Sequence, residues 1–470
     1  MKRASIMAIV PVAVLLAFAL CTISESAAEP IAGGDAAATP ATPATPAPAA
    51  TTPAQSQEIK DAVARFREQD IEGCLKMLKE AVKKDPELSP ANVMLAQFFA
   101  QANRGDLARN ALERAVLDNP DDPEAYVLMG SIAMREGRVT EARLLFEKAN
   151  SLTDKVSDAK RKKNLLPAIL GGLAMTSEAR TDWAGAQRHL EAWLKLDPEN
   201  TTALTQLGQV LLQQKDETGA LEQFTKASKI DEQLAKENKT ESKLLSPEAS
   251  LAEFYARTND QKNAAKWMVT AINKKPRDAK IRLLAGQWAL ETGKLTDAKK
   301  QAGFALEIDP KSLNAKILCG VVALFQKDYP TAETYFQQAL LDSPDNFAAS
   351  NDLALALIEQ KDTVKQERAA KYADDNYRRY AKTNQAAAAC STYGWVLYKL
   401  GRIDDAEKLL RAAASGGGLT PDTAYYLARV LNKSGHVKDA KDLLDRALQS
   451  TVPFQHRDDA QAMLDDLKKN

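Results

Sequence analysis

Apolar side chains recur through residues 57–454 at helical spacing, in paired stretches that short polar turns connect. Most pairs end beside a proline, and proline ends a helix because it lacks an amide donor and clashes with the preceding turn. The pattern therefore predicts an all-α chain of helical hairpins with proline joints. The joint prolines are Pro86, Pro120, Pro198, Pro276, Pro310 and Pro344.

These prolines are separated by 34, 78, 78, 34 and 34 residues, and 78 is twice 34 plus an insertion of ten. A period in this range is typical of a solenoid. When the joint proline is given position 32, eleven repeats align, and position 8 is alanine or glycine in all of them. The repeats start near residues 55, 89, 123, 167, 201, 245, 279, 313, 347, 387 and 421.

Small side chains at positions 8 and 20, such as Gly130 and Ala142, allow the two helices of a hairpin to approach closely. Larger side chains at positions 7, 11 and 24 fill the space around that contact. One hairpin cannot bury its apolar face alone, so each copy is expected to cover the next.

This pattern resembles the tetratricopeptide repeat family over roughly residues 55–454. The resemblance implies an α-solenoid, a right-handed superhelix of about eleven hairpins closed by a capping helix. One repeat carries the family's residue types at positions 4, 7, 8, 11, 20, 24 and 27, namely Tyr126, Met129, Gly130, Ala133, Ala142, Phe146 and Ala149.

The chain begins with features of a bacterial secretory signal, predicted over residues 1–28. Lys2 and Arg3 precede an apolar run from Ile6 to Leu20, and small residues precede Glu29. A lipidated Cys21 or an uncleaved anchor are the alternatives, and they are the one route by which we expect contact with a membrane. Residues 29–56, rich in Ala, Pro and Thr, predict a disordered linker.

The expected domains are thus the signal, the linker, a solenoid over residues 57–454 and a capping helix over residues 455–470. Insertions at 157–166 and 235–244 break the period, and a third, near 361–370, obscures the second helix of the ninth repeat. The first insertion contains Lys160-Arg-Lys-Lys163. This run is either a solvated helix end or a contact for an acidic partner or a lipid headgroup.

Composition argues against several functions. The net charge is zero, which gives no indication of nucleic-acid binding. His189, His436 and His456 are far apart and lack partners at metal or triad spacing. We therefore predict no enzyme activity, no cofactor and no metal. The odd number of cysteines in the exported part (Cys74, Cys319 and Cys390) argues against disulfides, and each is expected to be buried.

In the family that the chain resembles, function lies on the concave face, at positions 2, 5, 9, 12 and 13 of the first helices. The lysine and asparagine pair by which some members bind a terminal carboxylate is missing at positions 5 and 9. The candidate binding residues in the last two repeats are Trp395, Tyr398, Tyr425, Arg429 and Lys433.

Aromatic rings beside cations suit a peptide or a sugar chain. The alternative is that the segment STYGWVLYKLG serves mainly for packing. A second apolar stripe in the eighth repeat, more typical of core, contains Ile317, Val321, Leu324 and Phe325.

Together these features predict a non-catalytic interaction scaffold of the periplasm or cell envelope, or a secreted one. It would bind a still unidentified protein or peptide segment in its concave groove. The alternative is a module associated with polysaccharide and its export.

Overall fold

The structure is a computed structural model, which describes residues 57–469 except 103, 157, 239, 241 and 416–418. The predicted signal (1–28) and linker (29–56) lie outside the described residues. Within the described residues every regular element is a helix, 23 of them α-helices, and the predicted all-α solenoid fold is confirmed.

The helices form eleven consecutive pairs, which we number as hairpins 1 to 11. The first helices are α1 (Gln57–Arg67), α3 (Ala91–Gln101), α5 (Pro123–Arg135), α7 (Ala159–Ala179), α9 (Thr201–Gln213), α11 (Pro247–Arg257), α13 (Ala279–Glu291), α15 (Leu313–Phe325), α17 (Phe347–Ile358), α19 (Ala386–Lys399) and α21 (Pro421–Lys433).

The second helices are α2 (Ile71–Lys84), α4 (Gly105–Asp118), α6 (Val139–Leu152), α8 (Trp183–Leu196), α10 (Glu217–Asn238), α12 (Gln261–Lys274), α14 (Leu295–Ile308), α16 (Tyr329–Asp342), α18 (Thr363–Tyr380), α20 (Ile403–Ser415) and α22 (Val437–Gln449). Helix α23 (Arg457–Lys469) follows them, and a short 3₁₀ turn, Thr153–Lys155, follows α6.

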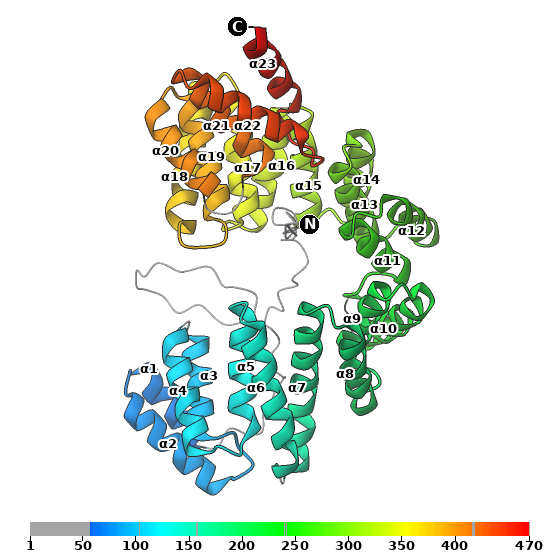
Figure 1. The fold of residues 1–470 in the computed structure, drawn as a ribbon, viewed down its shortest axis with the longest axis vertical. Coiled ribbons are helices and arrows are strands. Elements are labelled where there is room, and N and C mark those ends of the chain that lie inside the picture. The colour runs from blue at the N-terminus through cyan, green and yellow to red at the C-terminus, as the bar shows by residue number, and fades with distance from the viewer. Residues whose placement is uncertain are drawn as a thin grey trace, which may run out of the picture. The chain divides into compact units, whose positions relative to one another are not determined.

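Figure 1 shows consecutive helices side by side, and the described residues divide into two compact units, up to Ala264 and from Ala265 onward. In each unit a helix packs on its hairpin partner and on a neighbouring hairpin, as α9 does on α10 and on α8. This is the nearest-neighbour packing expected of stacked repeats.

Three of the glycines at position 8, Gly130, Gly208 and Gly320, make room for a phenylalanine ring from the second helix of the hairpin. A Cβ on Gly320 would lie 2.6 Å from the ring of Phe336, and one on Gly208 would lie 2.5 Å from that of Phe224. Both rings are almost fully buried. The predicted close approach therefore takes the form of an aromatic ring resting on a bare backbone.

The turn inside a hairpin is made in two ways. Among the described residues, position 15 has a positive φ in nine hairpins. Where it is glycine, as at Gly137, no side chain caps the next helix. Where it is another residue, as at Thr181 or Lys327, an aspartate follows and accepts an amide of the next helix. That cap offsets the conformational cost of the non-glycine residue.

The insertions mostly lengthen helices. Residues 159–166 extend the start of α7, which runs for 21 residues with Pro167 inside it, and residues 235–238 extend the end of α10. The prediction for the third insertion was wrong, since α18 is one continuous helix of 18 residues. Its buried positions Ala369, Ala373 and Asn376 keep a single apolar face, and Asn376 accepts the Ser350 hydroxyl at 2.9 Å.

Candidate binding pocket on hairpins 8 to 11

A pocket of about 600 Å³ lies in the second unit and brings four of the five candidate residues together. Trp395 and Tyr398 come from α19, and Tyr425 and Arg429 come from α21. We call it the aromatic pocket. Lys433 is exposed one turn further along α21 and does not line the pocket.

The floor of the aromatic pocket is a stack of rings. The centre of the Trp395 ring lies 4.4 Å from that of Tyr426 and 5.2 Å from that of Tyr398, and both pairs of rings are close to parallel. Trp395 and Tyr425 are each only 3% exposed. Tyr398, which is half-buried, offers a partner part of its ring.

Hydrogen bonds fix the orientation of this floor. The indole N–H of Trp395 donates to Glu359, the residue after α17, at 2.8 Å, and Lys399 binds the other oxygen of that carboxylate at 2.9 Å. The indole is therefore held by its ring faces and by its one polar atom, so it is a rigid part of the pocket.

Arg429 differs from the two lysines of the pocket, because no described carboxylate forms an ion pair with it. Its Nε donates to the Tyr398 hydroxyl at 3.3 Å, and its guanidinium lies 5.9 Å from the centre of that ring. In contrast, Lys327 binds Asp459, and Lys399 binds Glu359. Among the described residues no carboxylate lies within ion-pair distance of Arg429.

The residues after α22 form one wall of the aromatic pocket, which the repeat pattern did not predict. His456 is 4% exposed, and its ring stacks on Tyr425 at 5.0 Å. Its Nδ1 lies 3.2 Å from Asp459. Burial lowers the pKa of His456, which favours the neutral ring at neutral pH. Met463 and Leu467 of α23 complete the wall.

Two carboxyl groups lie beside this wall, Asp352 in the middle of α17 and Asp422 at the start of α21. Burial raises the pKa of Asp352 to about 6. Burial, together with the charge of Asp352, raises that of Asp422 to about 7, although the backbone N–H of Gln455 donates to Asp422. Asp422 therefore titrates near neutral pH, at the point where the C-terminal residues meet hairpin 11.

The apolar stripe of hairpin 8 belongs to the core. Leu324 is buried, and Ile317, Val321 and Phe325 are half-buried against the apolar clusters around them. The three cysteines of the described residues, Cys74, Cys319 and Cys390, are free and buried, as predicted.

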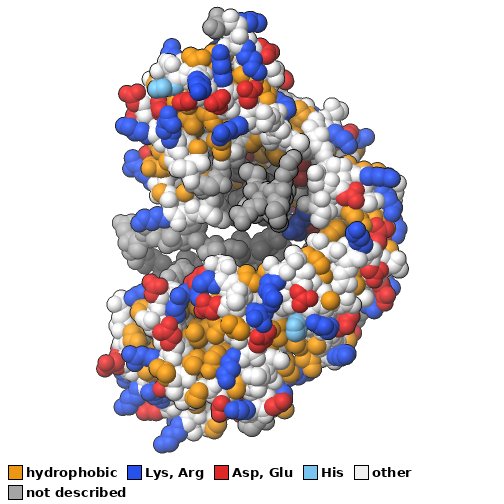
Figure 2. All heavy atoms as spheres, in the orientation of Figure 1, with side chains coloured by type: hydrophobic (Ala, Val, Ile, Leu, Met, Phe, Trp, Pro, Cys, Tyr) orange, Lys and Arg blue, Asp and Glu red, His pale blue; other side chains and the backbone are white. Residues whose placement is uncertain are grey.

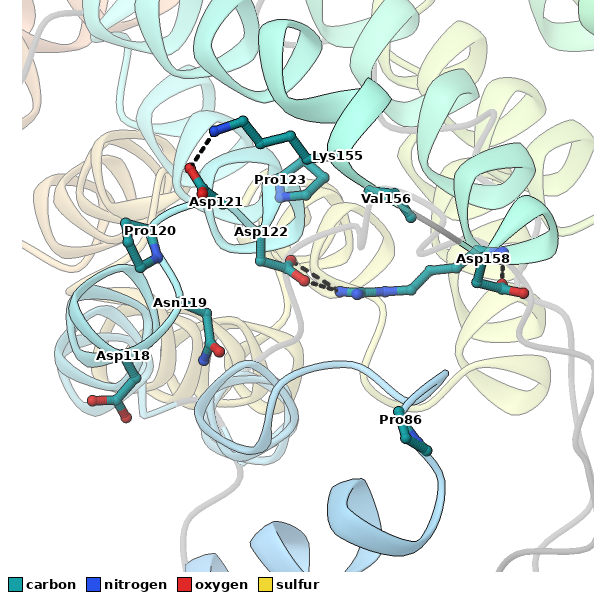
Figure 3. Close-up of a pocket in the computed structure, with 11 residues that line it drawn as sticks. Pro86, Asp118, Asn119, Pro120, Asp121, Asp122, Pro123, Lys155, Val156 and Asp158 are labelled. Atoms are coloured by element: carbon teal, nitrogen blue, oxygen red, sulfur yellow. Dashed lines mark hydrogen bonds and ion pairs between the residues drawn. The ribbon is translucent and has the colours of Figure 1, made fainter.

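A second pocket, of about 370 Å³, lies in the first unit at the joint between hairpins 2, 3 and 4 (Figure 3). Arg161 reaches back from α7 and binds Asp122 at 2.7 Å and Glu124 at 2.8 Å. The lysine on each side of this joint is also paired, Lys155 with Asp121 and Lys162 with Asp154.

Two of the four bases of the basic run, Arg161 and Lys162, thus bind acids of their own chain. Lys160 and Lys163 remain exposed. On the face seen in Figure 2, acidic and basic side chains are interspersed over the described residues and do not separate by sign.

No helix of the described residues combines the length and the apolar character that a membrane crossing requires. Nor do three or more metal-binding side chains come together in this part of the chain.

Comparison with known proteins agrees with the repeat pattern. Three family models, each described as tetratricopeptide repeat, match residues 65–132, residues 123–155, and residues 173–235, 320–381 and 393–465, which together make up more than half of the chain. No enzyme family is among these matches. A search of curated proteins returned no match.

Among solved structures, yeast Tom70 is 14% identical, with 88% of this chain and 95% of that chain covered and a TM-score of 0.36. A tetratricopeptide repeat protein from Parabacteroides merdae is 12% identical, with 65% and 100% covered and a TM-score of 0.38. YrrB, titled a protein with an unusual peptide-binding site, is 19% identical, with 43% and 98% covered and a TM-score of 0.27. Such scores say nothing about what this chain binds.

Proposed function

Since the chain belongs to the tetratricopeptide repeat family, we propose that it is a non-catalytic scaffold that binds a segment of a partner protein in the aromatic pocket. The family's fold is typical of protein interaction scaffolds. The export signal expected at the N-terminus supports a place in the periplasm or cell envelope.

The observation that carries this proposal is the combination of Tyr398 and Arg429 over a rigid ring floor. Tyr398 presents part of an aromatic face, and no carboxylate in the described part of the chain lies within ion-pair distance of Arg429. A pre-formed apolar floor with a few polar groups around it is the usual character of a binding pocket. Aromatic and arginine side chains also dominate binding energy at protein interfaces.

Capture from a cell-envelope extract tests the proposal. The bait is the full chain, compared with Tyr398→Ala/Arg429→Ala. Lys433→Ala is the matched control, because it removes a cation from the same helix outside the pocket. We expect one set of proteins to bind the unaltered chain and the control, and to be lost with the double variant.

Equal recovery by all three baits would remove the aromatic pocket from the proposal. Retention of carbohydrate in place of protein, lost with the same double variant, would favour the polysaccharide-associated alternative.

A further inference from the structure

Residues 453–467, here called the C-terminal segment, reach well beyond the hairpin that precedes them. Pro453 lies beside Gly293, with its Cγ 3.9 Å from the position that a Cβ there would occupy. Asp459 binds Lys327 at 2.9 Å, across 132 residues of sequence. His456 contacts the rings of Trp395 and Tyr425.

The C-terminal segment thus touches hairpins 7, 8, 10 and 11. Trp395 and Tyr425 stand at positions 9 and 5 of their repeats, which the family resemblance assigns to the concave face. The segment therefore lies on the surface to which we assign partner binding, and it covers part of the aromatic pocket.

The segment is attached in a way that permits exchange. Thr451 and Val452, which link the segment to α22, are exposed. Helix α22 packs against α21 within hairpin 11, so the last hairpin has its own partner helix independently of the segment. The side chains of the ion pair between Lys327 and Asp459 are 45% and 41% exposed, so the pair contributes little to stability. The firm attachment comes from three buried apolar side chains, Phe454, Ala460 and Leu464.

Polar atoms at this interface are poorly matched. The Nε2 atom of His456 is buried and meets no hydrogen-bonding partner among the described residues, and the same holds for Oδ1 of Asp422. Buried polar atoms without partners weaken an association. A different segment that met these atoms with its own polar groups would bind the face more tightly.

We propose that the C-terminal segment is an internal occupant of the partner-binding face, and that a partner segment of the same chemistry displaces it. This inference rests on the proposed function and adds its regulation. The chemistry follows from the attaching side chains Phe454, Ala460 and Leu464: an aromatic residue, followed by two apolar residues one helical turn apart.

Exchange in the full chain tests the inference. A protease site is inserted between Thr451 and Val452 and cut after folding, so that the segment is held by contacts alone. The probe is a fluorescein-labelled synthetic peptide of residues 451–469, with binding followed by anisotropy. The control peptide replaces Phe454 and His456 with alanine.

We expect the labelled peptide to bind the cut chain and to be competed away by the unlabelled one. It should bind the uncut chain at least about 100-fold more weakly, because the tethered segment has a high effective concentration. The control peptide should bind neither form.

Equal binding to the cut and uncut chains would overturn the inference, since the peptide would then sit elsewhere. So would a segment that stays fixed after cutting and never exchanges, or a cut chain that loses its helical circular dichroism. These outcomes leave the capture experiment unaffected. Conversely, exchange of the peptide with no partner captured would count against the proposed function alone.

Discussion

Trp395 and Glu359 join hairpins 10 and 9 through one hydrogen bond, from the indole N–H to the carboxylate at 2.8 Å. The carboxylate is nearly buried, with 10% of the side chain exposed. Glu359→Leu should destabilise the second unit by about 1–3 kcal/mol, because it leaves a buried indole N–H without an acceptor. The midpoint of urea unfolding, followed by circular dichroism, measures the change.

Glu359→Gln is the matched control for this prediction, since its amide oxygen still accepts the indole N–H while the charge facing Lys399 is lost. Its midpoint should lie close to that of the unaltered chain. Equal losses for the leucine and glutamine variants would mean that the charge, and not the hydrogen bond, stabilises the floor of the pocket.

Gly320 and Gly303 provide a matched pair for the packing of a hairpin. A Cβ on Gly320 would lie 2.6 Å from Phe336, whereas nothing lies within 4 Å of one on Gly303 in α14. Gly320→Ala should therefore cost about 1–3 kcal/mol through overpacking. Gly303→Ala should stabilise by roughly 0.5–1 kcal/mol, as alanine does within a helix. Thermal melts of the two variants test this prediction. A change in melting temperature of the same sign for both variants would contradict the packing described.

Arg161 should stabilise the joint between hairpins 3 and 4. Its side chain is 17% exposed and binds two acids that are similarly buried, so Arg161→Met leaves Asp122 and Glu124 without their cation. We expect a loss of about 2–4 kcal/mol, near the lower range for breaking a buried pair. Lys155→Met removes an exposed pair and should change stability by less than about 1 kcal/mol. Equal shifts of the denaturant midpoint in the Arg161→Met and Lys155→Met variants would show that the burial of Arg161 does not increase its contribution to stability.

Asp422 should make stability depend on pH near neutrality. Its pKa is raised to about 7 in the folded chain from an ordinary value of 3.8, so its contribution is fully present below 3.8 and is lost as the pH rises through 7. Asp422→Asn cannot ionise. It should be more stable than the unaltered chain at pH 8, by on the order of 1–3 kcal/mol, and the difference should shrink toward pH 4.

The lowered pKa of His456 acts in the opposite direction on acidification, but this residue is present in both proteins and its effect cancels in the difference. Melting temperatures of the two proteins from pH 4 to 8 test the expectation. A difference that stays constant with pH would contradict the burial of the Asp422 carboxyl.

The sequence predicted the fold well because each repeat contacts its neighbours, so a local period contains most of the packing. Gly320 and Phe336 belong to one hairpin, sixteen residues apart. The same reasoning placed Trp395, Tyr398, Tyr425 and Arg429 on one face. It could not predict how deeply the Trp395 and Tyr425 side chains are buried, because their burial depends on how closely the rings stack.

The wall of the aromatic pocket was beyond such reasoning. Asp459 meets Lys327 across 132 residues, and a period of 34 carries no information about a segment that follows the last repeat. Glu359 and Lys399 could have been found, since both stand at position 13, one of those assigned to the concave face. Arg161 was hidden in a basic run, and only the start of α7 shows which of its bases turns inward.

The central claim is that a partner segment lies against Tyr398 and Arg429. Photo-crosslinking tests it most directly, with a benzophenone amino acid placed at position 398 of the full chain and irradiated in the presence of the envelope extract. The same amino acid at position 433 is the control. The account predicts a crosslink from position 398 to one defined peptide of another protein, with none from position 433. Crosslinks from position 398 that reach only residues of its own chain would contradict it.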